Sequence, residues 1–221
     1  MARMIPIARE GWRVIGVVAG VLGPVAVIGT LAGHPVAVLP LLLMLAFSFY
    51  FFRDPERQPP PDDRQVVSPA DGKILHVTAG REDIFLNAPA TIISIFMSPL
   101  DVHVNRSPVR GTIELVKHTA GKFRAAFHDK ASLDNERNAM VLESGGRRFV
   151  VIQIAGAVAR RIINHHNPGD RLERGERYGL IMFGSRVDIF LPPDVKPMVA
   201  KGDRVTAGSS VIAEIPAGAP S

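Results

Sequence analysis

The chain has 221 residues, which suits one or two ordinary domains and excludes a long multidomain enzyme. With 26 basic and 21 acidic side chains its formal net charge is +5, yet 47% hydrophobic residues and a mean hydropathy of +0.16 make it too apolar for a disordered chain or a typical nucleic-acid-binding domain. The absence of cysteine excludes disulfides, thiol nucleophiles, thiolate zinc sites and iron–sulfur clusters. We therefore expect no nucleic-acid partner and a nucleophile of another residue type.

The N-terminal part contains a long apolar run. No Lys, Arg, Asp or Glu occurs in residues 14–52, and His34 is the one strongly polar interruption. A membrane-crossing helix needs about 20 residues, so the run has room for two short crossings, or for one crossing and an interfacial helix. Gly33-His34-Pro35 lies at the midpoint and is typical of a turn. A cleaved signal peptide fits poorly because its apolar core has only about 7–15 residues. We expect residues 1–52 to form a membrane anchor, most simply a transmembrane helical hairpin.

Arginines flank this run on both sides: Arg3, Arg9 and Arg13 before it, and Arg53, Arg57 and Arg64 after it. Basic flanks of membrane helices stay on the cytoplasmic side. Both ends of the anchor are then cytoplasmic, as a hairpin requires. We expect the rest of the chain to lie on the cytoplasmic face of the cell (inner) membrane.

Residues 53–65 have the character of a linker, with Pro59-Pro60-Pro61 as a stiff spacer. From residue 66 to residue 221 the chain reads as short β segments separated by Gly, Pro and Asp. The expected strands include 73–78, 91–96, 149–154, 186–190 and 210–215, and a helix is conceivable only near 156–164. The predicted fold class is β-rich α+β, with a β domain behind the helical hairpin.

Two segments of the β domain have related patterns. Ser68-Pro-Ala-Asp71-Gly-Lys73 lies near its start, and Lys201-Gly-Asp-Arg-Val-Thr-Ala-Gly208 lies near its end. Both resemble turns of the barrel-sandwich hybrid fold of biotinyl and lipoyl carriers. A carrier needs its modified lysine at a hairpin tip, whereas Lys73 and Lys201 lie beside glycine turns. The pattern therefore predicts a barrel-sandwich-hybrid-like fold without a carrier function.

Taken separately, the polar motifs of this domain are weak signals. Asp71-Gly72 is most often a simple turn, and a lone histidine such as His103 is usually structural, although it can act as an acid or base near neutral pH. The adjacent pair His165-His166 would point to opposite faces of a strand and has no metal-ligand spacing around it. We expect no metal site.

Gly184-Ser185 lies between two apolar segments and offers a specific chemistry. A glycine before a serine leaves its carbonyl open to attack by the serine hydroxyl and lets the backbone bend into a strained geometry. These are the requirements of an internal N-to-O acyl shift.

Together the motifs identify a family resemblance. Ser68-Pro-Ala-Asp71-Gly, Ser98-Pro-Leu-Asp-Val-His103 and Gly175-Glu-Arg-Tyr-Gly-Leu-Ile-Met-Phe-Gly184-Ser185-Arg186, all behind a hydrophobic N-terminus, resemble phosphatidylserine decarboxylases of the short type that ends in Gly-Ser-Arg. The resemblance covers essentially the whole chain, including Phe-Phe-Arg53-Asp-Pro-Glu-Arg57 and Asp134-Asn-Glu-Arg-Asn138. Longer members have a second histidine where this chain has Arg106, so no role of that histidine is carried over.

The resemblance implies a self-processing mechanism. The proenzyme would cut itself between Gly184 and Ser185, with Asp71 orienting and charge-stabilising His103, and His103 taking the proton of the Ser185 hydroxyl. The resulting ester would eliminate and hydrolyse to a covalent pyruvoyl group at position 185. Fragment 185–221 would stay bound to fragment 1–184. The pyruvoyl carbonyl would form a Schiff base with the serine amine of phosphatidylserine and accept the electrons released with carbon dioxide, so that phosphatidylethanolamine forms.

The same resemblance implies a substrate held in the membrane, and Arg137, Arg160 and Arg161 are candidates to bind its phosphate. Two other functions are weighed against it. A noncatalytic membrane-anchored barrel-sandwich adaptor explains the anchor and the turns, but not the joint presence of Asp71, His103 and Gly184-Ser185. A serine hydrolase lacks Gly-x-Ser-x-Gly. A homo-oligomer is compatible with the sequence.

Overall fold

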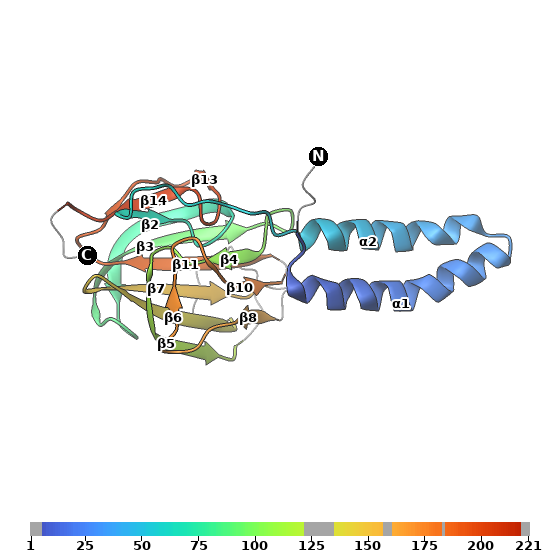
Figure 1. Cartoon of the computed structure of the whole chain (residues 1–221), viewed down its shortest axis with the longest axis horizontal. Helices are drawn as coiled ribbons and strands as arrows, with labels where there is room; N and C mark the ends of the chain where they lie inside the picture. The colour runs from blue at the N-terminus through green and yellow to red at the C-terminus, as the bar shows by residue number, and fades with distance from the viewer. Residues whose placement is uncertain (1–5, 122–134, 157–160, 183, 218–221) are drawn as a thin grey trace. The chain divides into compact units, whose positions relative to one another are not determined.

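The computed structural model describes residues 6–121, 135–156, 161–182 and 184–217. The chain divides into two compact units, Met1–Glu56 and Arg57–Ser221. The first unit is helical and the second is built of strands (Figure 1).

The helical unit consists of α1 (Arg9–Leu31), a short 3-10 helix η1 (Pro35–Val38) and α2 (Leu39–Phe51). Figure 1 shows α1 and α2 side by side, and the Trp12 and Phe49 rings meet edge to face with centroids 6.3 Å apart. Among the described residues, α1 is the one helix long and apolar enough to cross a membrane, and Pro35–Phe51 is a shorter apolar stretch. Val17, Val21 and Leu31 are exposed on α1. A surface this apolar is typical of a protein or membrane contact.

The second unit forms one eight-stranded sheet in the order β13-β2-β3-β11-β7-β6-β5-β9 and two three-stranded sheets, β1-β14-β12 and β4-β10-β8. Figure 1 shows the large sheet curling around the interior of the unit. The strands are β1 Gln65–Val67, β2 Gly72–Glu82, β3 Ala88–Met97, β4 Val104–Arg106, β5 Gly111–Thr119, β6 Arg137–Ser144, β7 Arg147–Ile154, β8 Ile162–Asn164, β9 Arg171–Leu172, β10 Arg177–Ile181, β11 Ser185–Leu191, β12 Lys196–Pro197, β13 Arg204–Val205 and β14 Val211–Glu214.

Alternation along the strands defines two faces of the large sheet. Ile93 and Ile95 on β3, and Val187 and Ile189 on β11, belong to the main core on the inner face. Residues of the opposite parity, such as Ile152 on β7, form a second cluster on the outer face with Phe85, Leu86 and Phe190. Because successive side chains of a strand point to opposite faces, β11 contributes to both layers. It pairs with β3 on one side and β7 on the other, so it lies in the middle of the sheet.

The β-rich class is confirmed, and strands occur in all five of the expected segments. The prediction of a helix near 156–164 is wrong for its last residues, because Ile162–Asn164 form β8 and pair with β10. Residues 157–160 lie outside the described part. Ile162 and Ile163 are β-branched, and the sheet edge of β10 offers them hydrogen-bond partners that a helix would not use.

The two related turn segments lie next to each other. Arg204 and Val205 of β13 pair with Lys73 and Gly72 of β2. The Ile74 amide also donates to the Asp203 carbonyl at 2.9 Å. The N-terminal and C-terminal ends of the β unit are therefore joined directly, beside the loop that carries Asp71.

Candidate active site

Ser185 is the first residue of β11 and faces the inner side of the sheet, in the same parity as Val187 and Ile189. It pairs with Met97 of β3 and is fully buried. Its hydroxyl donates to the Met97 sulfur at 3.5 Å. A thioether is a weak acceptor, so the Ser185 oxygen is not committed to a strong hydrogen bond there.

Gly184 precedes this serine in a conformation that side chains disfavour. Its φ of +51° lies in the left-handed region, and no described atom lies within 4 Å of the position a Cβ would take. The glycine is therefore required by the backbone conformation and not by a lack of space. Its neighbour Phe183 lies outside the described residues.

His103 lies just before β4 and is fully buried. Its carbonyl accepts from the Ile181 amide at 3.3 Å, which extends the pairing of β4 with β10, the strand that leads toward Gly184. The Nδ1 atom lies 2.9 Å from the Asp101 carbonyl oxygen. A carbonyl can only accept, so Nδ1 carries the proton and, in the neutral ring, Nε2 is the basic nitrogen.

The Asp71 carboxylate is held by two other groups. Arg57 donates to both carboxylate oxygens, with Nη2 to Oδ2 at 2.8 Å and a shorter contact from Nη1, and the Ala207 amide donates to Oδ1 at 2.8 Å. The loop before Asp71 reaches β4, because the Arg106 amide donates to the Pro69 carbonyl at 3.0 Å. Asp71 and His103 thus belong to adjoining segments, and the Asp71 carboxylate is hydrogen-bonded to Arg57 and Ala207.

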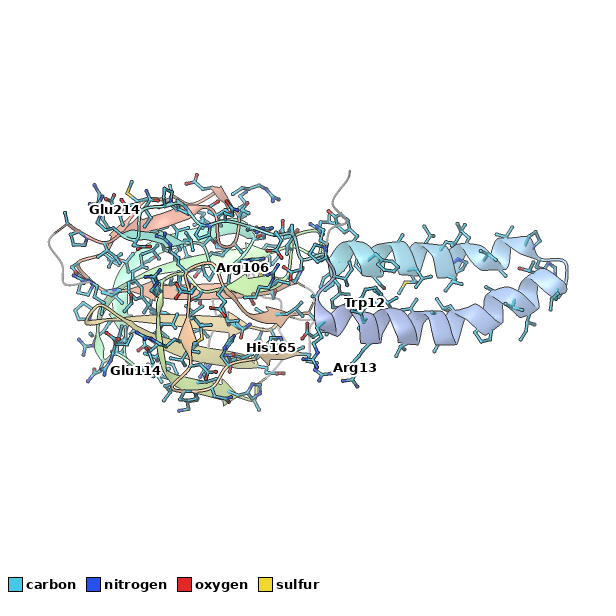
Figure 2. All side chains as sticks on the ribbon, in the orientation of Figure 1. Trp12, Arg13, Arg106, Glu114, His165 and Glu214 are labelled. Carbon is cyan, nitrogen blue, oxygen red and sulfur yellow. The ribbon has the colours of Figure 1, made fainter. Side chains whose placement is uncertain are left out.

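The three arginines considered for the lipid phosphate have different positions. Arg137 opens β6 and pairs with Ile154, which in turn pairs with Arg186. Arg161 is exposed, and its carbonyl accepts from the Met182 amide at 3.2 Å, two residues before Gly184. Arg160 lies outside the described residues. Figure 2 shows Arg106 and His165 on the side of the β unit that carries β4 and β8.

Several polar groups of this region were not predicted from the sequence as site residues. Arg57, expected as a membrane flank and as the end of the Phe-Phe-Arg53-Asp-Pro-Glu-Arg57 segment, pairs with Asp71. On the inner face, the amides of Asn105, Gln153 and Asn138 are buried in one hydrogen-bonded series. They could have been found as polar residues at strand positions whose side chains face the core, because buried polar groups are usually hydrogen-bonded.

The outer face holds a charged group next to Ser185. Arg186 donates to Asp188 through Nε to Oδ1 at 2.6 Å and Nη2 to Oδ2 at 2.8 Å, and both side chains are only 4% exposed. Nη2 also donates to the Ser94 hydroxyl at 2.9 Å, and this hydroxyl lies 2.8 Å from His76 Nε2. Nη1 of Arg186 has no hydrogen-bond partner within the described part of the chain. The buried positive charge is compensated within its own strand.

One residue on the inner side of the sheet has a strongly shifted pKa. Tyr178 on β10 is completely buried, and burial raises the pKa of its hydroxyl far above the usual value. Its hydroxyl has no hydrogen-bond partner among the described residues. It is therefore neutral throughout the physiological range.

Comparison with known proteins agrees with these motifs. The family model described as phosphatidylserine decarboxylase matches residues 44–213. A phosphatidylserine decarboxylase proenzyme of Syntrophotalea carbinolica is 44% identical over 94% of this chain and 95% of its own length. Proenzymes of the same name from Polynucleobacter asymbioticus and Symbiobacterium thermophilum are each 43% identical over 95% of this chain and 95% and 96% of their own lengths. The chain belongs to the phosphatidylserine decarboxylase family.

Proposed function

We propose that this chain is a phosphatidylserine decarboxylase that cuts itself between Gly184 and Ser185 and carries a pyruvoyl group made from Ser185. The observation that carries the proposal is that a left-handed glycine precedes a buried serine at the start of a central strand. Within the described residues, the hydroxyl of this serine donates to a weak thioether acceptor. The proenzyme names of the relatives support the same reading. An adaptor function gains no support from these relatives.

The self-cleavage uses groups of the chain itself. His103 Nε2 accepts the hydroxyl proton of Ser185, and the oxygen attacks the Gly184 carbonyl carbon. An oxyanion forms, the carbon–nitrogen bond breaks with protonation of nitrogen, and an ester replaces the amide. Loss of the Ser185 α proton then expels the Gly184 carboxylate and leaves a dehydroalanine, which tautomerises and is hydrolysed with release of ammonia.

The pyruvoyl carbonyl supplies the electron-accepting group for decarboxylation of the serine headgroup. His103, whose first proton transfer is then complete, delivers a proton to the carbon that carbon dioxide leaves. Fragment 185–221 begins with β11, which pairs with β3 and β7 of the other fragment. Its release would expose an apolar strand and two unpaired sheet edges, so the fragments stay associated.

The helical unit fits a hairpin anchor of residues 1–52 that keeps the β domain, 66–221, on the cytoplasmic face of the membrane, with 53–65 as linker. The pairing of β13 with β2 supports a barrel-sandwich-hybrid-like arrangement of the two turns. Phosphatidylserine then stays in the bilayer while its headgroup reaches Ser185. Arg137, Arg160 and Arg161 are the candidates for its phosphate, at ~1 kcal/mol per basic side chain near an anionic surface.

The proposal is tested with vesicles that contain phosphatidylserine labelled in the serine carboxyl group. The full chain in detergent or liposomes should release labelled carbon dioxide and form phosphatidylethanolamine. Ser185→Ala should release none, whereas Ser144→Ala at the end of β6 should behave as the wild type. A wild-type chain that is stable but releases no label would contradict the function.

The role of Asp71 has a separate test, because its carboxylate is bound by Arg57 and Ala207. If its charge supports His103, Asp71→Asn should slow self-cleavage by at least about 10²-fold. Arg57→Met, which keeps the carboxylate, should slow it less. Equal rates for Asp71→Asn and wild type would show that Asp71 only joins the turn to the loop that carries Ala207.

A further inference from the structure

Three buried amides form a directed series on the inner face of the sheet. Asn138 Nδ2 on β6 donates to Gln153 Oε1 on β7 at 3.1 Å, and Gln153 Nε2 donates to Asn105 Oδ1 on β4 at 2.9 Å. Asn105 and Gln153 are fully buried, and Asn138 is 4% exposed. The carbonyl oxygens of Gln153 and Asn105 each accept from the preceding amide, so the amino group of Asn105 is the last donor of the series.

The Asn105 amino group shares a contact with Ser185. Asn105 Nδ2 contacts the Met97 sulfur at 3.7 Å and the Pro69 carbonyl at 3.5 Å. The Ser185 hydroxyl contacts the same sulfur. The Asn105 amino group and the nucleophile therefore meet at one weak acceptor. Asn105 is also two residues after His103, and residues two apart in an extended segment project to the same side.

The contacts of this amino group are long. Ordinary N–H to O hydrogen bonds measure about 2.7–3.2 Å, and a thioether accepts weakly. A buried donor with such contacts is under-satisfied and gains most from a new, charged acceptor. Oxyanion formation at the carbonyl of Gly184, the residue before Ser185, would create a charged acceptor.

The fold keeps the series in place. Gly179 of β10 pairs with Asn105, and a Cβ there would lie 3.1 Å from Gln153 Nε2 and 2.1 Å from the Ile163 carbonyl oxygen. The glycine lets Gln153 and β8 approach β10 together. Without Gln153, the Asn105 amide could turn its oxygen toward Ser185, and an oxygen there would repel the developing negative charge.

We infer that the Asn105 side-chain amide donates the hydrogen bond that stabilises the oxyanion formed when Ser185 attacks Gly184, and that Gln153 and Asn138 are positioning residues that hold its amino group toward that oxygen. This inference rests on the proposed self-cleavage. Preorganised donors of this kind act in a buried site where water cannot replace them.

Self-cleavage of newly synthesised full chain in liposomes, followed over time on denaturing gels, tests the inference. Asn105→Ala should slow cleavage by about 10²–10³-fold, the usual effect of losing one oxyanion donor. Gln153→Glu keeps its size and still accepts from Asn138, but its carboxylate cannot donate to Asn105. It should slow cleavage by about 10-fold, since the donor is present but no longer oriented.

Asn105→Asp supplies a signature that a structural role would not produce. Its carboxylate has no proton to donate, but its protonated form has one, and burial raises the pKa of a carboxyl group. The ratio of its cleavage rate to the wild-type rate should rise as pH falls from 8 to 5. The same ratio for Asn105→Ala should stay constant, and a constant ratio for Asn105→Asp would overturn the inference.

Two controls separate the outcomes. Leu142→Ala removes a buried core side chain further along β6 and should lower the thermal midpoint without slowing cleavage. Equal slowing would show that lost stability explains the amide variants.

Uncut Asn105→Ala chains should resist neutral hydroxylamine because their 184–185 bond is still an amide. Hydroxylamine-sensitive chains would place the defect after ester formation and overturn the inference. A wild-type chain that stays uncut would overturn the proposed function itself.

Discussion

The two faces of β11 carry different kinds of buried polar group within a few residues of each other. On the outer face, Arg186 and Asp188 form a charged pair that also holds Ser94. On the inner face, Ser185 shares the Met97 sulfur with the amide of Asn105, and these groups are neutral. The charged pair lies within one strand and binds Ser94 of the neighbouring β3, whereas the amide series crosses three strands and ends in weak contacts.

The two faces therefore have different roles: the outer charged pair stabilises β11, and the inner neutral groups take part in the reaction at its first residue. A buried ion pair whose charges are matched locks the strand segment in one geometry, but Nε and Nη2 of Arg186 and the Asp188 carboxylate are already engaged with each other and with Ser94. A series of neutral amides leaves its terminal donor for an acceptor that appears only during reaction. The outer face should therefore respond to mutation mainly in stability, and the inner face mainly in the rate of self-cleavage.

The largest stability effect is expected from breaking the outer pair. In the uncut Ser185→Ala chain, Arg186→Met leaves Asp188 buried without its partner and should lower the free energy of unfolding by about 3–5 kcal/mol. Arg186→Met combined with Asp188→Leu should recover much of this loss, because no unpaired charge remains. Chemical unfolding in detergent measures both. Arg110→Met, at an exposed pair with Glu173, is the matched control and should leave stability unchanged. A single variant as stable as its control would contradict the assignment of the outer pair as the strand lock.

A smaller effect is expected at Gly184, the residue just before β11, where a substitution should change the rate of self-cleavage. Gly184→Ala must place a side chain at a φ of +51°, which costs roughly 1–2 kcal/mol. If that conformation is the one that reacts, self-cleavage should slow by about 10-fold. Gly146→Ala, with a φ of +75° and open space around it in the β6–β7 turn, carries the same backbone penalty away from the site. Its cleavage rate should match the wild type, and equal slowing in both variants would remove the special role of Gly184.

The smallest effect is expected at Tyr178, on the inner side but outside the amide series. Burial raises the pKa of its hydroxyl, so the folded state holds the proton more tightly than the unfolded state. The stability it contributes is complete below about pH 10 and is lost as pH rises further. Tyr178→Phe should equal or exceed the wild type in thermal midpoint at neutral pH, since the buried hydroxyl has no partner in the described chain. The advantage of Tyr178→Phe should grow above pH 10, and a constant difference would contradict this pKa shift.

Much of the sheet could be predicted from sequence because burial imposes an alternating pattern on long strands. Ile93, Ile95 and Met97 show it on β3. The short strand β8 could not be predicted, because three residues carry no period and its pairing with β10 decides its conformation.

The candidate reactive groups can be proposed from the sequence, but their partners cannot. Gly184-Ser185 and His103 follow from local motifs. The pairing of Arg57 with Asp71 joins a linker residue to a turn, and the Asp101 carbonyl that binds His103 is a backbone group, which no side-chain pattern reports. Gln153 could have been found as a polar residue at the inward parity of β7, yet its partner Asn105 comes from a different sheet.

The most direct test of the central claim is the intact mass of the purified full chain under denaturing conditions, with and without an amine and cyanoborohydride. We predict two fragments, residues 1–184 and 185–221, and a small fragment whose blocked N-terminus gains the mass of the reduced amine adduct. A single uncut chain of 23.9 kDa that carries no adduct would contradict self-cleavage at Gly184-Ser185 and, with it, the pyruvoyl-dependent function.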